Sequence, residues 1–311
     1  MTAGLPQPAS APTMYFVGVT TGGSAIHAVF RAWKPLLGLE SAELVGIDLP
    51  LDADREDYRR VVRFIGDDPL SRGALVTTHK LRLFEASRDL LVRLNDDARE
   101  LAEVSCLVSE DDGVAGLALD AVTSGLALRA ITPDLAGRQV LLMGAGGAAL
   151  ALASYLASLP REQAPTHVTV TDVVARNLES LAAHVRGRGA DGWDYVLLER
   201  DQPQDDLLAA LPAGSLVVNA TGKGKDRPGS PLSDDAVFPE GALCWEFNYR
   251  GSLEFLHQAR RQAGARDLQV HDGWIYFVHG WTRAIAEVFD LDIPTEGPGF
   301  DRIAEAAREV R

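Results

Sequence analysis

Cysteine is scarce in this sequence, with only Cys106 and Cys244 among 311 residues. Two cysteines so far apart suggest neither a disulfide framework nor the paired spacing of a zinc site, and a cytoplasmic location is the simplest expectation. No apolar run reaches eighteen residues, so we expect no transmembrane helix. The first dozen residues are rich in proline and alanine but lack the basic and apolar regions of a signal peptide, which predicts a loose tail.

Basic residues are also outnumbered, since 30 lysines and arginines stand against 44 aspartates and glutamates, for a net charge of -14. This balance argues against nucleic acid or an anionic membrane as a partner. We expect a small-molecule substrate instead, bound by a monomer or a homodimer. Hydrophobic residues make up 46% of the chain, as in ordinary globular proteins, and the length favours two domains.

Strand-like and helix-like segments alternate in the first part of the chain. Short apolar runs are followed by segments of helical spacing in three pairs: 14–20 with 25–39, 42–50 with 52–66, and 73–78 with 81–94. This alternation predicts a largely parallel sheet covered by helices. Within it, we expect Pro35 to bend or end its helix early, and either Asp52 or Asp54 to cap the next helix.

A hairpin and a second α/β unit follow. Two extended runs flank the turn residues 111–113, Asp-Asp-Gly, and predict a hairpin. Later apolar runs predict further strands at 167–172, 215–224 and 243–251, and a long helix at 272–291.

The stretch "VLLMGAGGAAL" places a glycine-rich turn between an apolar strand and a helix. Gly144 allows the tight turn, Gly146 lets the backbone approach a pyrophosphate, and small residues such as Ala148 let the helix pack closely. Phosphate would lie at the amino end of the helix. The pattern predicts a dinucleotide site at Gly144, Ala145, Gly146, Gly147 and Ala148, and the flanking strand and helix make it more specific.

Asp172 ends the next strand-like run, "HVTVTD", 28 residues after Gly144. A carboxylate there would accept the hydroxyls of the adenosine ribose and repel a 2′-phosphate, which favours NAD over NADP. Two alternatives remain open. Asp172 would otherwise be only the N-cap of the following helix, and Arg176, one turn on, would accommodate a phosphate.

Lys80 and Asp120 both follow strand-like runs in the first part of the chain. In an α/β sheet, the carboxyl ends of the strands face the ligand crevice. Oxidation of an alcohol by a nicotinamide cofactor needs a proton acceptor beside the hydroxyl, and a lysine held by an aspartate supplies one. Taken alone, such a pair is more often found on the surface. His79 is interpreted as a packing or capping residue rather than as the base.

Six segments in order resemble the shikimate dehydrogenase family, with quinate dehydrogenases as close relatives. The segments are "VTTHK", "GLALDAVTSG", "GAGGA", "NATGKG", "FNYRGSLEFL" and "DGWIYFVHGW". The resemblance implies that Lys80 is the catalytic acid/base and that Asp120 is its partner. It also implies that Asn219, Ala220, Thr221 and Tyr276 lie near the nicotinamide.

The resemblance further implies a substrate shell of Thr21, Ser24, Thr77, Ser105, Phe247 and His279. This shell departs from the family pattern. In "TGGSAIH", Gly23 stands where the second of two carboxylate-binding serines belongs; Ser105 replaces an asparagine, and Phe247 replaces a tyrosine, although Tyr249 lies two residues on. His279 and Trp281 fill either the pocket or the core. The Asn-Arg-Thr of NADP-using members becomes 172–174, Asp-Val-Val, which supports NAD.

We therefore predict an α/β protein of two lobes. Residues 13–130 form a substrate-binding domain completed by 271–311, and residues 131–270 form a Rossmann NAD(P)-binding domain. The predicted function is oxidation of a ring hydroxyl in a shikimate- or quinate-like cyclic acid, with NAD preferred and NADP as the other cofactor. One alternative is a dehydrogenase for an aminated or otherwise modified cyclitol. Another is a non-catalytic dinucleotide-binding sensor or interaction module.

Overall fold

The computed structural model describes residues 4–132, 134–225 and 227–311. Unit 1 contains the chain up to Leu119 together with Val278–Arg311, and unit 2 contains Asp120–Phe277. The sequence placed the boundaries near residues 130 and 270. The difference has a packing cause, because the helix that starts at Asp120 packs against another helix of unit 2.

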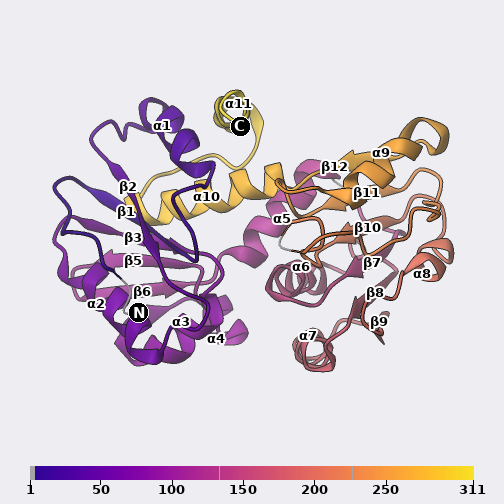
Figure 1. The fold of residues 1–311 in the computed structure, drawn as a ribbon, viewed down its shortest axis with the longest axis horizontal. Coiled ribbons are helices and arrows are strands. Elements are labelled where there is room, and N and C mark those ends of the chain that lie inside the picture. The colour runs from indigo at the N-terminus through magenta and orange to yellow at the C-terminus, as the bar shows by residue number, and fades with distance from the viewer. Residues whose placement is uncertain (1–3, 133, 226) are drawn as a thin grey trace. The chain divides into compact units, whose positions relative to one another are not determined.

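The sheet of unit 1 is mixed (Figure 1). Its strands are β1 (Thr13–Gly18), β2 (Glu43–Asp48), β3 (Ser71–Val76), β4 (Leu91–Leu94), β5 (Cys106–Glu110) and β6 (Gly113–Leu117). They lie in the order β2-β1-β3-β5-β6-β4. β1 is parallel to β2 and β3, whereas β5 is antiparallel to β3 and β6. The β5–β6 hairpin around the Asp-Asp-Gly turn confirms the prediction.

Helices cover both faces of this sheet. They are α1 (Ile26–Leu37), α2 (Arg55–Asp67), α3 (Lys80–Ser87), α4 (Asp96–Leu101), α11 (Gly297–Glu309) and the later part of α10 (Trp274–Phe289). Residues of α2 and α3 form one core with Tyr15 and Val17 of β1. On β1, Phe16 packs edge-to-face against Trp281 of α10, with ring centroids 5.0 Å apart. The Trp33 indole of α1 donates a hydrogen bond to the Ile303 carbonyl of α11, at 2.8 Å.

The ends of two predicted helices agree with their local chemistry. Asp54, one of the two predicted caps, forms a reciprocal capping box with Asp57 at the start of α2. Pro35 lies in the last turn of α1, which ends at Leu37 with Gly38 in the left-handed conformation.

The single helix predicted for residues 81–94 is wrong. Helix α3 ends at Ser87, a short 3₁₀ turn follows, and Leu91–Leu94 is strand β4, parallel to β6. A short apolar run fits a helix and a strand equally well, so its conformation depends on the element that it packs or pairs with. Here β6 offers an open backbone edge, and Gly116 leaves room for Leu91, whose methyl carbon would lie 2.8 Å from an added Cβ.

The sheet of unit 2 is entirely parallel among its described strands. These are β7 (Gln139–Met143), β8 (His167–Asp172), β9 (Trp193–Leu197), β10 (Leu216–Asn219), β11 (Leu243–Glu246) and β12 (Gln269–His271). Their order is β12-β11-β10-β7-β8-β9. The order reverses beside β7, which is where ligands bind in open α/β sheets. The predicted α/β fold is thus confirmed.

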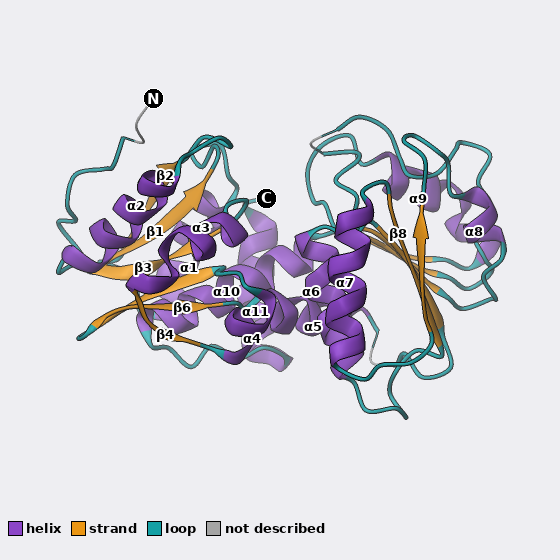
Figure 2. Ribbon diagram, turned by 90° about the horizontal axis from the view of Figure 1, so that it is seen from below, coloured by secondary structure: helices purple, strands orange, loops and turns teal. Residues whose placement is uncertain are grey.

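Alternate residues of these strands serve two cores. Helices α5 (Asp120–Ile131), α6 (Gly147–Ser158) and α7 (Ala175–Gly187) share a core with Val140 and Leu142 of β7. On the opposite face, α8 (Asp205–Ala209) and α9 (Glu254–Arg266) pack on Leu141 and Met143. Figure 2 shows these two sets of helices on the two sides of the sheet. Burial on both faces explains the continuous apolar runs.

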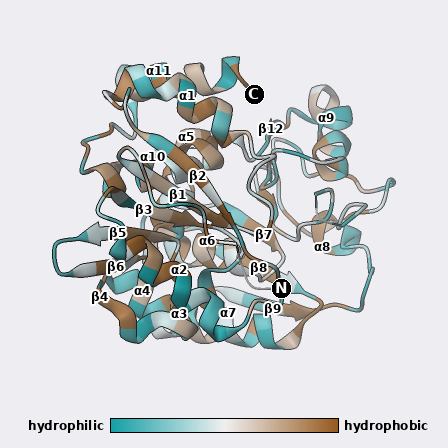
Figure 3. Ribbon diagram, turned by 60° about the vertical axis from the view of Figure 1, so that its left-hand side comes forward, coloured by the Kyte–Doolittle hydropathy of each residue, from teal (hydrophilic) through white to brown (hydrophobic). Residues whose placement is uncertain are grey.

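The outer helices are amphipathic, as their position requires. In Figure 3, α11 carries both hydrophobic and hydrophilic residues; its buried members are Phe300, Ile303, Ala304 and Ala307. Among the described helices, none has the length and apolar character needed to cross a membrane.

Two helical glycines predict opposite responses to an added methyl group. A Cβ on Gly125 of α5 would lie 2.3 Å from the Tyr155 ring of α6, whereas one on Gly264 of α9 would meet nothing within 4 Å. We expect Gly125→Ala to lower the free energy of unfolding by about 1–3 kcal/mol through overpacking. The matched Gly264→Ala should raise it by about 0.5–1 kcal/mol, because alanine favours the helix. Urea denaturation of both variants measures this, and equal effects would contradict the α5–α6 packing.

Candidate active site

In unit 1, the predicted substrate residues Thr21, Thr77 and Ser105 lie at one edge of the sheet. The parallel strands β1, β2 and β3 all end at this edge. Strand β5 begins there, because it is antiparallel to β3, and β6 ends there, since Cys106 pairs with Leu117. The loops that carry Thr21, Thr77 and Ser105 therefore come together although they are far apart in the sequence.

Thr21 is buried and bound to a carboxylate. Its backbone N–H and its hydroxyl both donate to Oδ1 of Asp48, at 2.8 and 2.6 Å. The close approach requires Gly46, where an added Cβ would lie 2.0 Å from the Thr21 hydroxyl oxygen. Because the hydroxyl proton points at Asp48, this oxygen can accept a hydrogen bond from a ligand but has no second proton to donate. Ser24 nearby is half-buried, and its hydroxyl accepts from the Ile26 N–H at 3.4 Å.

The segment between β3 and α3 is anchored by Thr77 and His79. The Thr77 N–H and hydroxyl both donate to the Val17 carbonyl, at 3.0 and 3.2 Å. His79 lies 3.0 Å from the Tyr58 hydroxyl through Nδ1 and 3.0 Å from the Leu49 carbonyl through Nε2. Burial lowers the pKa of His79, which keeps the ring neutral. With both nitrogens engaged, His79 is a packing residue, and half-buried Lys80 follows it at the start of α3.

Two side chains form hydrogen bonds with the backbone that precedes Asp120. The Ser105 hydroxyl accepts from the Leu119 N–H at 2.8 Å. Asn95 accepts from the Ala118 N–H and donates to the Ala118 carbonyl, both at 3.0 Å. Asp120 then opens helix α5 and is half-buried. Sequence reasoning missed Asn95, whose only signal was its place as N-cap before α4.

His279 lies in the core of unit 1. Its side chain is fully buried, and its ring stacks on Phe300 of α11 with centroids 4.2 Å apart. Trp281 is also buried, against Phe16. Both positions correspond to the core-filling interpretation of this helix.

In unit 2, the predicted glycine turn lies between β7 and α6. Gly144 has a φ of +102°, and an added Cβ would lie 2.8 Å from the Ala220 carbonyl oxygen. A Cβ on Gly146 or Gly147 would meet nothing within 4 Å. Gly146 is the N-cap of α6 and has no side chain to occupy the first N–H groups of the helix. These residues fit a dinucleotide, because the open backbone and the helix dipole both favour a pyrophosphate.

Asp172 ends β8, as predicted, and it stabilises the glycine turn. Its Oδ2 accepts from the Ala145 N–H at 2.7 Å, and its Oδ1 accepts from the Val174 N–H at 2.8 Å. The alternative that Asp172 is the N-cap of α7 is wrong, because Val174 is the N-cap. The carboxylate is half-buried and therefore also accessible to a ligand. Exposed Val173 and Leu197 beside it offer apolar surface.

The predicted nicotinamide segment turns sharply after β10. The side-chain carbonyl oxygen of Asn219 accepts from the Thr221 N–H at 3.1 Å and from the Thr221 hydroxyl at 2.7 Å. The Ala220 N–H donates to the Met143 carbonyl at 2.8 Å, which joins this turn to the end of β7. Phe247, which directly follows β11, is buried, and its ring centroid lies 5.3 Å from that of half-buried Tyr276.

Glu246 is a residue that sequence reasoning missed. It ends β11, is fully buried and accepts hydrogen bonds from the side chains of Asn219 and Asn248, at 2.5 and 2.6 Å. Burial raises the pKa of Glu246 to about 7, against the lowering effect of these donors. Its signal in the sequence was a single acid inside the apolar run "LCWEF".

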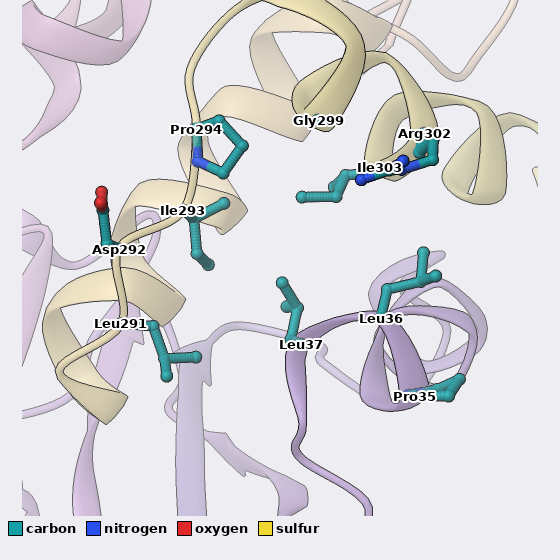
Figure 4. Close-up of a pocket in the computed structure, with 10 residues that line it drawn as sticks. All are labelled: Pro35, Leu36, Leu37, Leu291, Asp292, Ile293, Pro294, Gly299, Arg302 and Ile303. Carbon is teal, nitrogen blue, oxygen red and sulfur yellow. The ribbon is translucent and has the colours of Figure 1, made fainter.

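A recess of about 430 Å³ lies in another part of unit 1 (Figure 4). It is formed by the end of α1, the segment after α10 and the start of α11. Leu37, Ile293 and Ile303 point into it, and Asp292 and Arg302 contribute polar groups. None of the predicted site residues lines it, so we assign no part of the chemistry to it.

Comparison with known proteins relates the chain to one group of enzymes. No family model matches it. It is 31% identical over 261 residues to a shikimate dehydrogenase (NADP(+)) from Methylobacterium radiotolerans, over 81% of this chain and 83% of that one. A quinate dehydrogenase from Corynebacterium glutamicum in complex with NAD has a TM-score of 0.74 at 20% identity, over 96% and 99% of the two chains. A shikimate 5-dehydrogenase from Thermus thermophilus in complex with NADP(H) and shikimate has a TM-score of 0.71 at 25% identity, with the same coverage.

The geometry at Gly144 predicts that this position cannot carry a side chain. Gly144→Ala combines an unfavourable φ with a contact to the Ala220 carbonyl, so we expect a loss of about 2–4 kcal/mol in the free energy of unfolding. Gly147→Ala, at an open position in the first turn of α6, should change it by less than about 0.5 kcal/mol. Thermal unfolding without cofactor measures both effects. A stable Gly144→Ala protein would contradict the close approach of the two loops.

Proposed function

This chain belongs to the shikimate dehydrogenase family, and we propose that it interconverts a ring hydroxyl and a ketone in a shikimate- or quinate-like cyclic acid with a nicotinamide cofactor. The observation that carries the proposal is the β7–α6 turn. Its backbone at Gly144 excludes any side chain, and its glycines leave the amino end of α6 open. A parallel sheet with such a turn at its switch point is suited to a dinucleotide.

The cofactor, when bound, supplies an acceptor or donor for hydride. The N–H groups of Gly146 and Gly147 would hold its pyrophosphate at the amino end of α6. Asp172 accepts a hydrogen bond from the Ala145 N–H in the turn and would accept hydrogen bonds from the hydroxyls of the adenosine ribose. Its negative charge disfavours a 2′-phosphate, so we propose NAD as the preferred cofactor.

The proton of the substrate hydroxyl needs a separate acceptor. Loss of hydride from the carbinol carbon leaves a ketone only if the hydroxyl also gives up its proton. We assign that proton to the Lys80 amine, with Asp120 orienting Lys80 and the reacting hydroxyl. In the reverse direction, the Lys80 ammonium returns the proton to the forming hydroxyl. His79 is unsuited to this role, because both of its ring nitrogens are engaged in the core.

A second candidate substrate class is favoured by Asp48. Thr21 stands where the family holds the substrate carboxylate, yet its hydroxyl proton is donated to Asp48. A carboxylate placed there would meet a second negative charge, whereas an amine or a hydroxyl would find acceptors. Gly23 also supplies no hydroxyl in place of the second serine. A dehydrogenase for an aminated cyclitol is therefore the alternative to a cyclic acid.

The proposed function is tested by following NADH absorbance with shikimate, quinate, their aminated analogues and a carboxylate-free cyclitol. We expect turnover of at least one of them, and Lys80→Ala should lower kcat by about 10²–10⁴-fold, the usual contribution of a general base. Binding of NAD, measured by calorimetry, should stay within about twofold because Lys80 serves the substrate.

Two outcomes would count against this assignment. NAD binding without turnover of any substrate would favour the non-catalytic dinucleotide-binding module. Unchanged turnover in Lys80→Ala would remove Lys80 as the proton carrier.

The cofactor preference rests on the charge of Asp172. We expect a higher kcat/KM with NAD than with NADP. Asp172→Asn should lower the ratio of these two kcat/KM values by roughly tenfold, which corresponds to about 1.4 kcal/mol of lost repulsion between the carboxylate and the 2′-phosphate. Asp194→Asn, the same change at an exposed position on β9, should leave the ratio unaltered. A wild-type protein that uses both cofactors equally would refute the preference.

A further inference from the structure

Glu246 is a buried acid that accepts hydrogen bonds from three N–H donors. Its Oε1 accepts from the Asn248 backbone N–H at 2.8 Å and from the Asn248 side-chain amide at 2.6 Å. Its Oε2 accepts from the Asn219 side-chain amide at 2.5 Å. The carboxyl group is fully buried at the carboxyl end of β11, so these protein donors take the place of water.

The contact with Asn219 fixes the turn that follows β10. Because the Asn219 amide nitrogen points at Glu246, its oxygen faces Thr221 and accepts both the N–H and the hydroxyl of that residue. The Thr221 hydroxyl oxygen in turn accepts from the Lys223 N–H at 3.1 Å. A reversed Asn219 amide would place its oxygen against the Glu246 carboxylate and its N–H groups against the Thr221 N–H, so the charge on Glu246 favours the observed orientation.

This turn borders the glycine turn of the cofactor site. The Ala220 carbonyl approaches Gly144 so closely that an added Cβ would lie 2.8 Å away. The Ala220 N–H is also bound to the carbonyl of Met143, the last residue of β7. A change in the shape of the 219–223 turn is therefore transmitted to the surface that faces the cofactor.

Protonation of Glu246 weakens its contact with Asn219. Oε1 already accepts two hydrogen bonds, whereas Oε2 accepts one, so the free lone pair that can take a proton is on Oε2. The hydroxyl oxygen of a neutral carboxyl group is a much poorer acceptor for the Asn219 amide than a carboxylate oxygen is. Burial raises the pKa of Glu246 to about 7, so both forms are populated near neutral pH.

The elements around Glu246 carry other charged and titratable groups, among them His257, Arg260, Arg261 and Arg266 of α9. Glu254 at the start of α9 raises the pKa of Glu246 further. Lys223 in the turn lies 3.4 Å from the Asp201 carboxylate. His271 on the neighbouring β12 has a pKa lowered by burial, which keeps it neutral. Lys225 and Asp272 flank the same region in the sequence.

We propose that Glu246 is a positioning residue, whose carboxylate holds the Asn219–Thr221 turn in its cofactor-binding shape and whose protonation releases it. The inference rests on the proposed cofactor function and adds a regulation by pH to it. Affinity for NAD falls as the pH drops through neutrality, because the protonated form holds the Asn219 amide more weakly.

The stability of the empty fold responds in the opposite direction. The pKa of Glu246 is about 7 in the folded protein, above the ordinary value of 4.5 for a glutamate, so the folded state binds the proton more tightly than the unfolded chain does. The contribution of Glu246 to stability therefore declines as the pH rises from about 4.5 to about 7. Loss of NAD affinity on acidification is thus separable from acid unfolding.

The test is calorimetric titration of the full chain with NAD between pH 5.5 and 8.5, without substrate. For the wild type, we expect affinity to weaken by about tenfold toward acid, with a midpoint near pH 7. Glu246→Gln mimics the protonated form, so its affinity should equal the acid value of the wild type and hardly vary with pH. Glu254→Gln is the same change in a neighbouring acid and should keep the wild-type pH dependence. Its midpoint should be slightly lower, because the negative charge of Glu254 that raises the pKa of Glu246 is removed.

A second variant keeps the test independent of whether Glu246→Gln folds. Asn248→Ala removes one donor to the carboxylate, which should raise the pKa of Glu246 and move the binding midpoint upward. A flat wild-type profile, or equal profiles in the wild type and Glu246→Gln, would overturn the inference while leaving NAD binding intact. Absence of NAD binding to the wild type at pH 8.5 would overturn the cofactor function together with it.

Discussion

The close approach of two backbone turns, at Gly144 and Ala220, is the constraint on which the candidate cofactor site depends. No side chain fits between them, so the turn after β7 passes directly against the turn after β10. Each turn is held by a carboxylate at the end of a neighbouring strand. Asp172 binds the Ala145 N–H, and Glu246 binds the Asn219 amide. The open glycines then face outward, and the amino end of α6 is left for an anion.

An acidic protein that binds an anionic cofactor needs local donors rather than a favourable overall field. With a net charge of -14, long-range attraction cannot bring a pyrophosphate to the site. Backbone N–H groups and a helix dipole supply the attraction at short range. The acids near the candidate site accept hydrogen bonds from the protein itself. Asp172 accepts from the Ala145 N–H, and Asp48 accepts from the Thr21 N–H.

In unit 1, several polar side chains at the sheet edge are engaged with the protein. Thr77 binds the Val17 carbonyl, and Ser105 binds the Leu119 N–H. Such residues shape the loops and retain limited capacity for a ligand. The residues at this edge also differ from the serine and asparagine pattern of the family.

The sequence by itself determined the strand–turn–helix pattern around Gly144, the cap at Asp54 and the membership of a family, because each depends on local spacing or on ordered motifs. It could not separate β4 from the end of α3, since a short apolar run takes the form its partner allows. Nor could it reveal that Asp48 would meet Thr21 or that Glu246 would meet Asn219, 27 residues away in each case. Only the tertiary structure decided these contacts, because parallel strands bring their carboxyl ends to one edge whatever their separation in the chain.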